Sequence, residues 1–132
     1  MKSLAQRVAL IFGVVFILVA IAGFITPGGM GMEAHLDKAP RELGLFPINL
    51  LHNIVHLAFG IWGILASRTH RAAVTYCRVG GIIYLVLTVL GFVAPDTFGL
   101  IPIGGNDIWL HALLGIVLAA VGFTAREVPA NS

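Results

Sequence analysis

Charged residues are scarce in this sequence: 11% of its 132 residues are Asp, Glu, Lys or Arg, while 58% are hydrophobic. Because a soluble domain usually carries about 25% charged residues, this chain lacks the polar surface that keeps such a domain in solution. It has a single cysteine, Cys77, which excludes an intrachain disulfide. Its formal net charge is only +2, and we see no basic surface that would bind nucleic acid.

Long apolar runs fill the chain instead. They form four blocks with almost no charge, each close to the roughly 17–25 residues that cross a hydrocarbon core. We predict membrane spans at about residues 8–26, 47–67, 74–94 and 107–125, within a single membrane domain over residues 1–132. The first block follows "MKSLAQR" as in a signal peptide, but it is long for a signal core, and we interpret it as a retained span.

Lysine and arginine are unevenly distributed around these spans. Six lie at the side of the two termini, and only two lie in the opposite loops: Lys2, Arg7, Arg68, Arg71, Arg78 and Arg126 against Lys38 and Arg41. Since cytoplasmic loops are enriched in Lys and Arg, we predict that both termini are cytoplasmic and that the loops at 27–45 and 96–107 face outward.

The two halves of the chain resemble each other. "GVVFILVAIAGFITP" (13–27) aligns without a gap with "GIIYLVLTVLGFVAP" (81–95), at an offset of 68. "GLFPINLLHNIVHLAFG" (44–60) aligns with "GLIPIGGNDIWLHALLG" (99–115), at an offset of 55, with Gly, Pro and one His matching. We predict two duplicated helical hairpins, residues 5–67 and 73–126. The alternative is that two unrelated hairpins both used Gly and Pro as terminators.

A duplication of this kind defines the fold. Each unit contains an even number of spans, so the two copies share one orientation and are related by a pseudo-two-fold axis along the membrane normal. The predicted fold class is an all-α integral membrane protein, a bundle of four transmembrane helices. In this bundle His56 and His111 are equivalent, and His52 corresponds to Asp107.

These four residues are the candidate functional group. His52 and His56 lie four residues apart, as do Asp107 and His111, so each pair shares one helix face in the outer half of the membrane. Ionisable groups inside a membrane are costly and suggest function. Three interpretations stay open: a hydrogen-bonded structural cluster, a zinc or copper site at His52, His56, Asp107 and His111, and ligation of haem b by His56 and His111.

Further residues bear on these interpretations. The outer loop "PGGMGMEAHLDKAP" offers Met30, Met32, Glu33 and His35, whose thioether and imidazole groups suit copper. No Ser or Cys nucleophile lies in the same outer layer, and no Gly-rich phosphate loop follows a strand, so we expect no enzyme. We predict a structural or accessory membrane subunit in contact with the lipid bilayer, and with a larger membrane complex or further copies of itself. The alternative is a metal- or haem-binding membrane protein.

Three segments carry a resemblance to a known family: "NIVHLAFGIWGILASR", "YCRVGGIIYLVLTVLGFV" and "PDTFGLIPIGGNDIWLHALLG". They resemble a bacterial family of small four-span membrane proteins that is known only as a domain of unknown function. The likeness is close over the last three spans and loose over the first. It implies a multi-pass protein of the bacterial inner membrane or the thylakoid, and it supplies no role for any residue.

Overall fold

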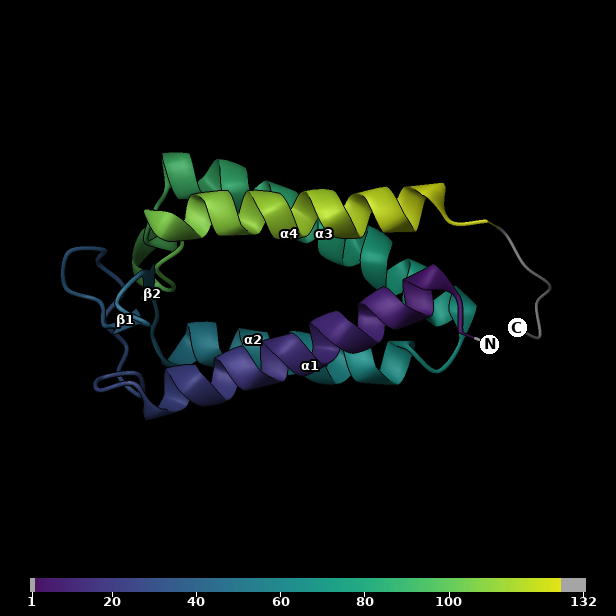
Figure 1. Cartoon of the computed structure of the whole chain (residues 1–132). Coiled ribbons are helices and arrows are strands. Elements are labelled where there is room, and N and C mark those ends of the chain that lie inside the picture. Colours follow the sequence, from purple (N-terminus) through teal and green to yellow (C-terminus); the bar gives the residue numbers. More distant parts are fainter. Residues whose placement is uncertain (1, 127–132) are drawn as a thin grey trace.

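The computed structural model describes residues 2–126. It contains four α-helices: α1 (Leu4–Ile25), α2 (Leu50–Ala66), α3 (His70–Val93) and α4 (Asn106–Thr124). Two short strands, β1 (Arg41–Glu42) and β2 (Phe46–Pro47), pair antiparallel, and a 3-10 turn spans Thr97–Gly99. Figure 1 shows α1 beside α2 and α3 beside α4, with the strands at the end opposite the N-terminus. The predicted bundle of four helices is confirmed.

Three of the helices are long and apolar enough to cross a membrane. These are α1, α3 and α4, with 22, 24 and 19 residues, whereas α2 has 17 residues. Large apolar side chains point outward along the bundle, and Ile11, Leu18, Val89 and Ile116 are 58–62% exposed. Apolar surface of this extent is unusual on a soluble monomer and is consistent with a membrane protein.

The start of α2 differs from the predicted span. The helix begins at Leu50, three residues after the expected start, because Pro47 belongs to β2 and Asn49 caps the helix. The Asn49 side chain accepts a hydrogen bond from the backbone nitrogen of His52 at 2.9 Å. His52 therefore lies in the first turn of α2, closer to the loop end of the bundle than a helix starting at Pro47 would place it.

Glycines allow the two helices of the first hairpin to approach closely. A Cβ added to Gly13 would lie 2.7 Å from the backbone nitrogen of Ile64, and one added to Gly60 would lie 2.9 Å from that of Ile17. Both distances are too short for a real side chain. The absence of a Cβ at these positions thus sets the distance between α1 and α2.

The second hairpin makes contacts of the same kind. A Cβ on Gly81 would lie 2.6 Å from the backbone nitrogen of Ala119, and one on Gly115 would lie 2.9 Å from that of Leu85. At the offsets of 68 and 55, these four positions are the counterparts of Gly13, Ile64, Gly60 and Ile17. Equivalent residues therefore hold the helices together in both hairpins.

The loops before α2 and α4 share most of their backbone course. "PRELGLFPI" (40–48) and "PDTFGLIPI" (95–103) both have positive φ at two matched positions, 56° and 71° at 43–44 and 59° and 91° at 98–99. The second loop has a third positive φ, 48° at Thr97, where the first loop has Glu42. The Ile48 nitrogen donates to the Pro40 carbonyl at 2.9 Å, and the Ile103 nitrogen donates to the Pro95 carbonyl at 2.7 Å. Left-handed Leu and Phe residues are uncommon, so their recurrence is specific.

Two asparagines connect the hairpins at this end of the bundle. The Asn49 amide donates to the Leu100 carbonyl at 2.7 Å, and the Asn106 amide donates to the Leu45 carbonyl at 2.8 Å. Asn106 is the first residue of α4, and Gly105 occupies the cap position. Each asparagine reaches from its own hairpin to the loop of the other hairpin.

Candidate metal centre

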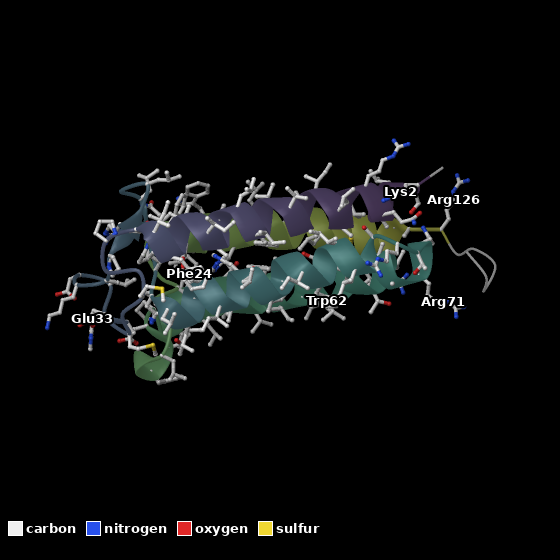
Figure 2. All side chains as sticks on the ribbon, turned by 90° about the horizontal axis from the view of Figure 1, so that it is seen from below. Lys2, Phe24, Glu33, Trp62, Arg71 and Arg126 are labelled. Atoms are coloured by element: carbon white, nitrogen blue, oxygen red, sulfur yellow. The ribbon has the colours of Figure 1, made fainter. Side chains whose placement is uncertain are left out.

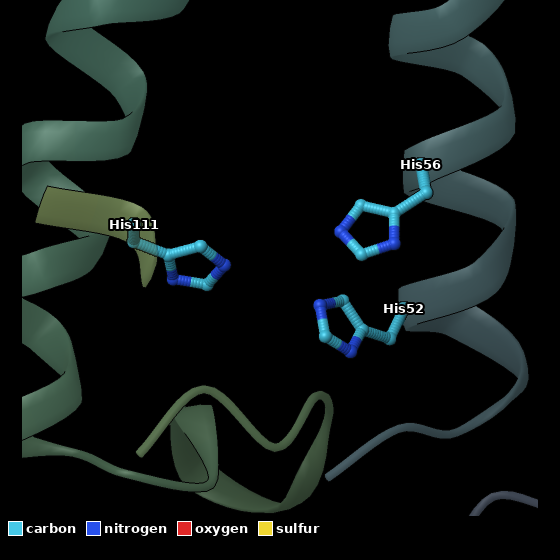
Figure 3. A group of neighbouring side chains, drawn as sticks. All are labelled: His52, His56 and His111. Atoms are coloured by element: carbon cyan, nitrogen blue, oxygen red, sulfur yellow. The ribbon is translucent and has the colours of Figure 1, made fainter. Parts of the chain in front are cut away.

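Three histidines and one aspartate meet inside the bundle. His52 and His56 come from α2, Asp107 and His111 come from α4, and none of the four is more than 7% exposed. One ring nitrogen from each histidine lies within 4.8 Å of those of the other two. Figure 3 shows the rings pointing toward one another, with His111 opposite His52 and His56. The structure thus brings together the residues that the sequence singled out.

The outer loop does not join this cluster. Met30 and Met32 are 60% and 49% exposed, and the His35 Nδ1 atom pairs with Glu33 Oε1 at 2.8 Å. The pKa of Glu33 is lowered, mainly because its carboxylate accepts a hydrogen bond from the His35 backbone. Within residues 2–126, the three histidines form the only group of three or more His, Cys, Asp or Glu side chains close enough to share a metal.

A hydrogen bond fixes the protonation of the His52 ring. Its Nδ1 atom lies 3.1 Å from the Pro47 carbonyl oxygen, and since a carbonyl can only accept, Nδ1 must donate. In the neutral ring, Nε2 then carries a lone pair. This pattern is the one that orients metal-binding histidines in proteins.

The Nε2 lone pair of His52 faces a carboxylate. Nε2 lies 3.6 Å from Oδ2 of Asp107, and neither atom has a hydrogen-bond partner within the described part of the chain. Two acceptors that face each other in a buried site repel unless a proton or a cation lies between them. Ligands of a tetrahedral Zn²⁺, each about 2.1 Å from the ion, are roughly 3.4 Å apart. The observed separation fits an ion and is too long for a hydrogen bond.

The other two histidines also have unused ring atoms. The Nδ1 atoms of His56 and His111 are buried and make no hydrogen bond to residues 2–126. Leaving a buried polar atom without a partner costs about 1–3 kcal/mol. These two ring atoms are therefore free of protein partners within the described residues.

An aromatic layer closes the cluster toward the middle of the bundle. Phe16 stacks on His56 with ring centroids 5.7 Å apart, and Tyr84 packs on His111 at 5.2 Å. Phe16 and Tyr84 also stack on each other at 5.6 Å, with their planes only 8° apart. Sequence reasoning missed this layer, although Phe16 and Tyr84 occupy equivalent positions at the offset of 68.

Sequence reasoning also missed Glu42, in β1. It is only 5% exposed, and its Oε1 atom has no hydrogen-bond partner among the described residues. Burial raises the pKa of this carboxyl group. Glu42 lines a cavity of about 330 Å³ together with His52, His56 and Asp107. Its counterpart at the offset of 55 is Thr97, so the repeat does not mark Glu42 as a site residue.

The match to a family model covers the helices and all four cluster residues. The model described as Domain of unknown function (DUF4383) matches residues 6–124. The chain belongs to the DUF4383 family. This confirms the resemblance to a domain of unknown function. No curated protein and no solved structure matches the DUF4383 chain.

In this DUF4383 chain, the position of His52 bears on the choice between haem and a single ion. The His52 ring centroid is 4.3 Å from that of His56 and 6.2 Å from that of His111. A haem ligated by His56 and His111 would need a flat space between these two rings. His52 lies beside that space with its lone pair directed inward, so the arrangement suits a compact ion better than a macrocycle.

Proposed function

We propose that this DUF4383 protein is an integral membrane protein that holds one divalent transition-metal ion, Zn²⁺ or Cu²⁺, between its two hairpins. The observation that carries the proposal is the pair of facing acceptors, His52 Nε2 and Asp107 Oδ2, 3.6 Å apart, with His56 and His111 beside them. Imidazole and carboxylate are the donors that such ions accept.

The ligand set supports a holding role over catalysis. Catalytic zinc sites use three protein ligands and keep a fourth position for water, whereas structural sites use four protein ligands. His52, His56 and His111 lie close enough to share one ion, and Asp107, which faces His52, would be the fourth ligand. An ion bound by them would join α2 of the first hairpin to α4 of the second.

The distribution of charge supports an orientation in the membrane. Figure 2 places Lys2, Arg71 and Arg126 at one end of the bundle and Glu33 at the other. We infer that the basic end is cytoplasmic, because Lys and Arg accumulate on that side of membrane proteins. The metal site then belongs to the outer half of the bilayer.

We also infer that the two hairpins arose by duplication and are related by a pseudo-two-fold axis. The support is the correspondence of contacts: Gly13 with Ile64 matches Gly81 with Ala119, and the left-handed turns at 43–44 and 98–99 recur. Independent use of Gly and Pro as terminators would account for the residues but not for equivalent contacts between them. The metal site would lie near this axis.

Metal analysis of the purified protein tests the proposed function. Protein isolated in detergent from its native membranes without chelator should contain about one zinc or copper ion per chain. The variants His56→Ala and His111→Ala should lose it. His35→Ala is the matched control, because His35 is exposed and lies outside the cluster, and this variant should retain the metal.

Two other results would overturn the proposal. A metal content near zero in wild-type protein, with no uptake of added Zn²⁺, would restore the hydrogen-bonded cluster and the accessory-subunit interpretation. A Soret absorption band that disappears in His56→Ala and His111→Ala would replace the single ion with haem.

A further inference from the structure

Two cavities flank the histidine cluster, and their linings correspond. The first, of about 330 Å³, is lined by α1, the β1–β2 segment, α2 and the start of α4. The second, of about 200 Å³, is lined by α2, α3, the loop before α4 and α4 itself. At the offsets of 68 and 55, apolar wall residues of the first cavity match those of the second: Val15 with Ile83, Phe46 with Ile101, and Leu110 with Val55.

One equivalent pair differs in chemistry. Glu42 lines the first cavity, and its counterpart Thr97 lines the second. The Thr97 hydroxyl is engaged with its own loop, where it accepts from the Ile101 nitrogen at 2.6 Å and lies 2.7 Å from the Asp96 carbonyl. The Glu42 carboxylate has a buried oxygen with no partner in residues 2–126. Only the first cavity therefore presents an unpaired carboxylate.

The first cavity contains two acidic side chains among mostly apolar lining residues. Glu42 and Asp107 are both acidic, both nearly fully buried and both line it, and its lining contains no Lys or Arg. Two carboxylates in one weakly polar cavity are unfavourable unless protons or a cation neutralise them. Leu43, which is 82% exposed, also lines this cavity and places it next to the molecular surface.

We propose that this cavity is the route by which a divalent cation reaches the histidine cluster, and that Glu42 is the carboxylate that receives the cation. The inference rests on the proposed metal site. Glu42 belongs to β1, outside α2 and α4, whereas Asp107 and His52 lie on those helices and belong to the cluster itself. All three side chains line the same cavity, so an ion received by Glu42 would share that cavity with two donors of the cluster. The Thr97 cavity offers no such first ligand.

Microscopic reversibility separates a route from a ligand. A residue that only assists passage speeds entry and exit equally, so its loss lowers the association and dissociation rates together and leaves the Kd unchanged. A residue that binds the resident ion mainly slows its exit, so its loss raises the dissociation rate. Rates as well as affinity must therefore be measured.

The experiment uses the full-length protein in detergent, stripped of metal, and ZnCl₂ as the probe. Stopped-flow mixing with a fluorescent zinc chelator gives both rate constants. For Glu42→Gln we expect association and dissociation to slow by roughly 10-fold or more, since local carboxylates raise cation on-rates by about that factor. The Kd should change less than about threefold, because the four cluster ligands remain.

Two variants serve as controls. Asp37→Asn removes an exposed acidic residue of the same outer loop and should leave both rates within about twofold of wild type, because exposed charges are screened. Glu42→Asp retains the charge and should bind zinc faster than Glu42→Gln. It keeps the test usable if Glu42→Gln does not fold.

The outcomes are distinguishable. Equal association rates for Glu42→Gln, Asp37→Asn and wild type would overturn the route. A higher dissociation rate with unchanged association would also overturn it and make Glu42 a ligand of the bound ion. If wild-type protein binds no zinc, the proposed function fails together with the route. If wild-type protein binds zinc, His111→Ala does not, and Glu42→Gln binds it at the wild-type rates, only the route fails.

Discussion

The contact between α3 and α4 makes a quantitative prediction at two adjacent glycines. A Cβ on Gly81 would lie 2.6 Å from the Ala119 nitrogen, so the helix backbones must separate by about 0.8 Å to reach an ordinary contact of 3.4 Å. Overpacking of this kind costs about 1–3 kcal/mol, against about 1 kcal/mol gained because alanine favours helix over glycine. A Cβ on Gly80 would meet side-chain atoms rather than backbone, Leu118 Cδ1 at 3.3 Å and Phe59 Cε1 at 3.8 Å. Gly80→Ala should therefore be neutral or stabilising.

The predicted difference between the two variants is about 1–3 kcal/mol, which corresponds to roughly 5–10 °C in Tm for a chain of this size. Cys77 provides the assay, because it is the only cysteine, it is fully buried, and a thiol-reactive fluorophore reports its exposure on heating. Gly13→Ala, in the other hairpin, should lower the Tm in the same way as Gly81→Ala and is remote from Cys77 along the chain. A Tm that falls equally in Gly80→Ala and Gly81→Ala would refute the argument from close backbone contact.

Three further predictions concern the end of the bundle where α2 and α4 begin. Because burial raises the pKa of Glu42 above its ordinary value of 4.5, the folded state holds this proton more tightly than the unfolded state does. In the presence of a chelator, the contribution of Glu42 to the free energy of unfolding should be complete below pH 4.5 and should fall as the pH rises through the raised pKa. A series of Tm measurements against pH should show this fall in wild-type protein and not in Glu42→Gln. Asn49→Ala should lower the free energy of unfolding by about 2 kcal/mol, because it removes both the cap of α2 and the hydrogen bond to the Leu100 carbonyl. Asn49→Asp keeps the cap and should lower it by about half as much in the same thermal melts. Zn²⁺ at about 100 times its Kd should stabilise wild-type protein by about 2.7 kcal/mol, a rise of roughly 10 °C in Tm that EDTA reverses and that His111→Ala lacks.

The sequence predicted the helices and the cluster because both depend on local periodicity. The apolar runs set the number of helices, and four-residue spacing placed His52 with His56 and Asp107 with His111 on common faces. Helix starts were less predictable. The predicted spans began after the charged residues Arg7 and Arg71. In the structure α1 begins at Leu4 and α3 begins at His70, so both arginines lie within helices.

The missed residues depend on tertiary contacts. Glu42 reads as an exposed loop residue until the antiparallel pairing of β1 with β2 places it over the end of the bundle. The stacking of Phe16 on Tyr84 depends on how the two hairpins pack against each other, which no local pattern encodes. The tautomer of His52 likewise depends on the Pro47 carbonyl, whose position follows from the extended backbone that precedes α2.

The short connection between α2 and α3, residues 67–69, joins both hairpins in one chain, and this widens the choice of side chains that can meet between the hairpins. Two identical hairpins that paired as a symmetric dimer would offer every donor twice, so three imidazoles with a single carboxylate could not arise. Covalent linkage lets each half mutate alone. This chain can therefore combine three imidazoles with one carboxylate, and can have the proposed cation route on one side of the cluster only. A symmetric pair of identical hairpins could have neither.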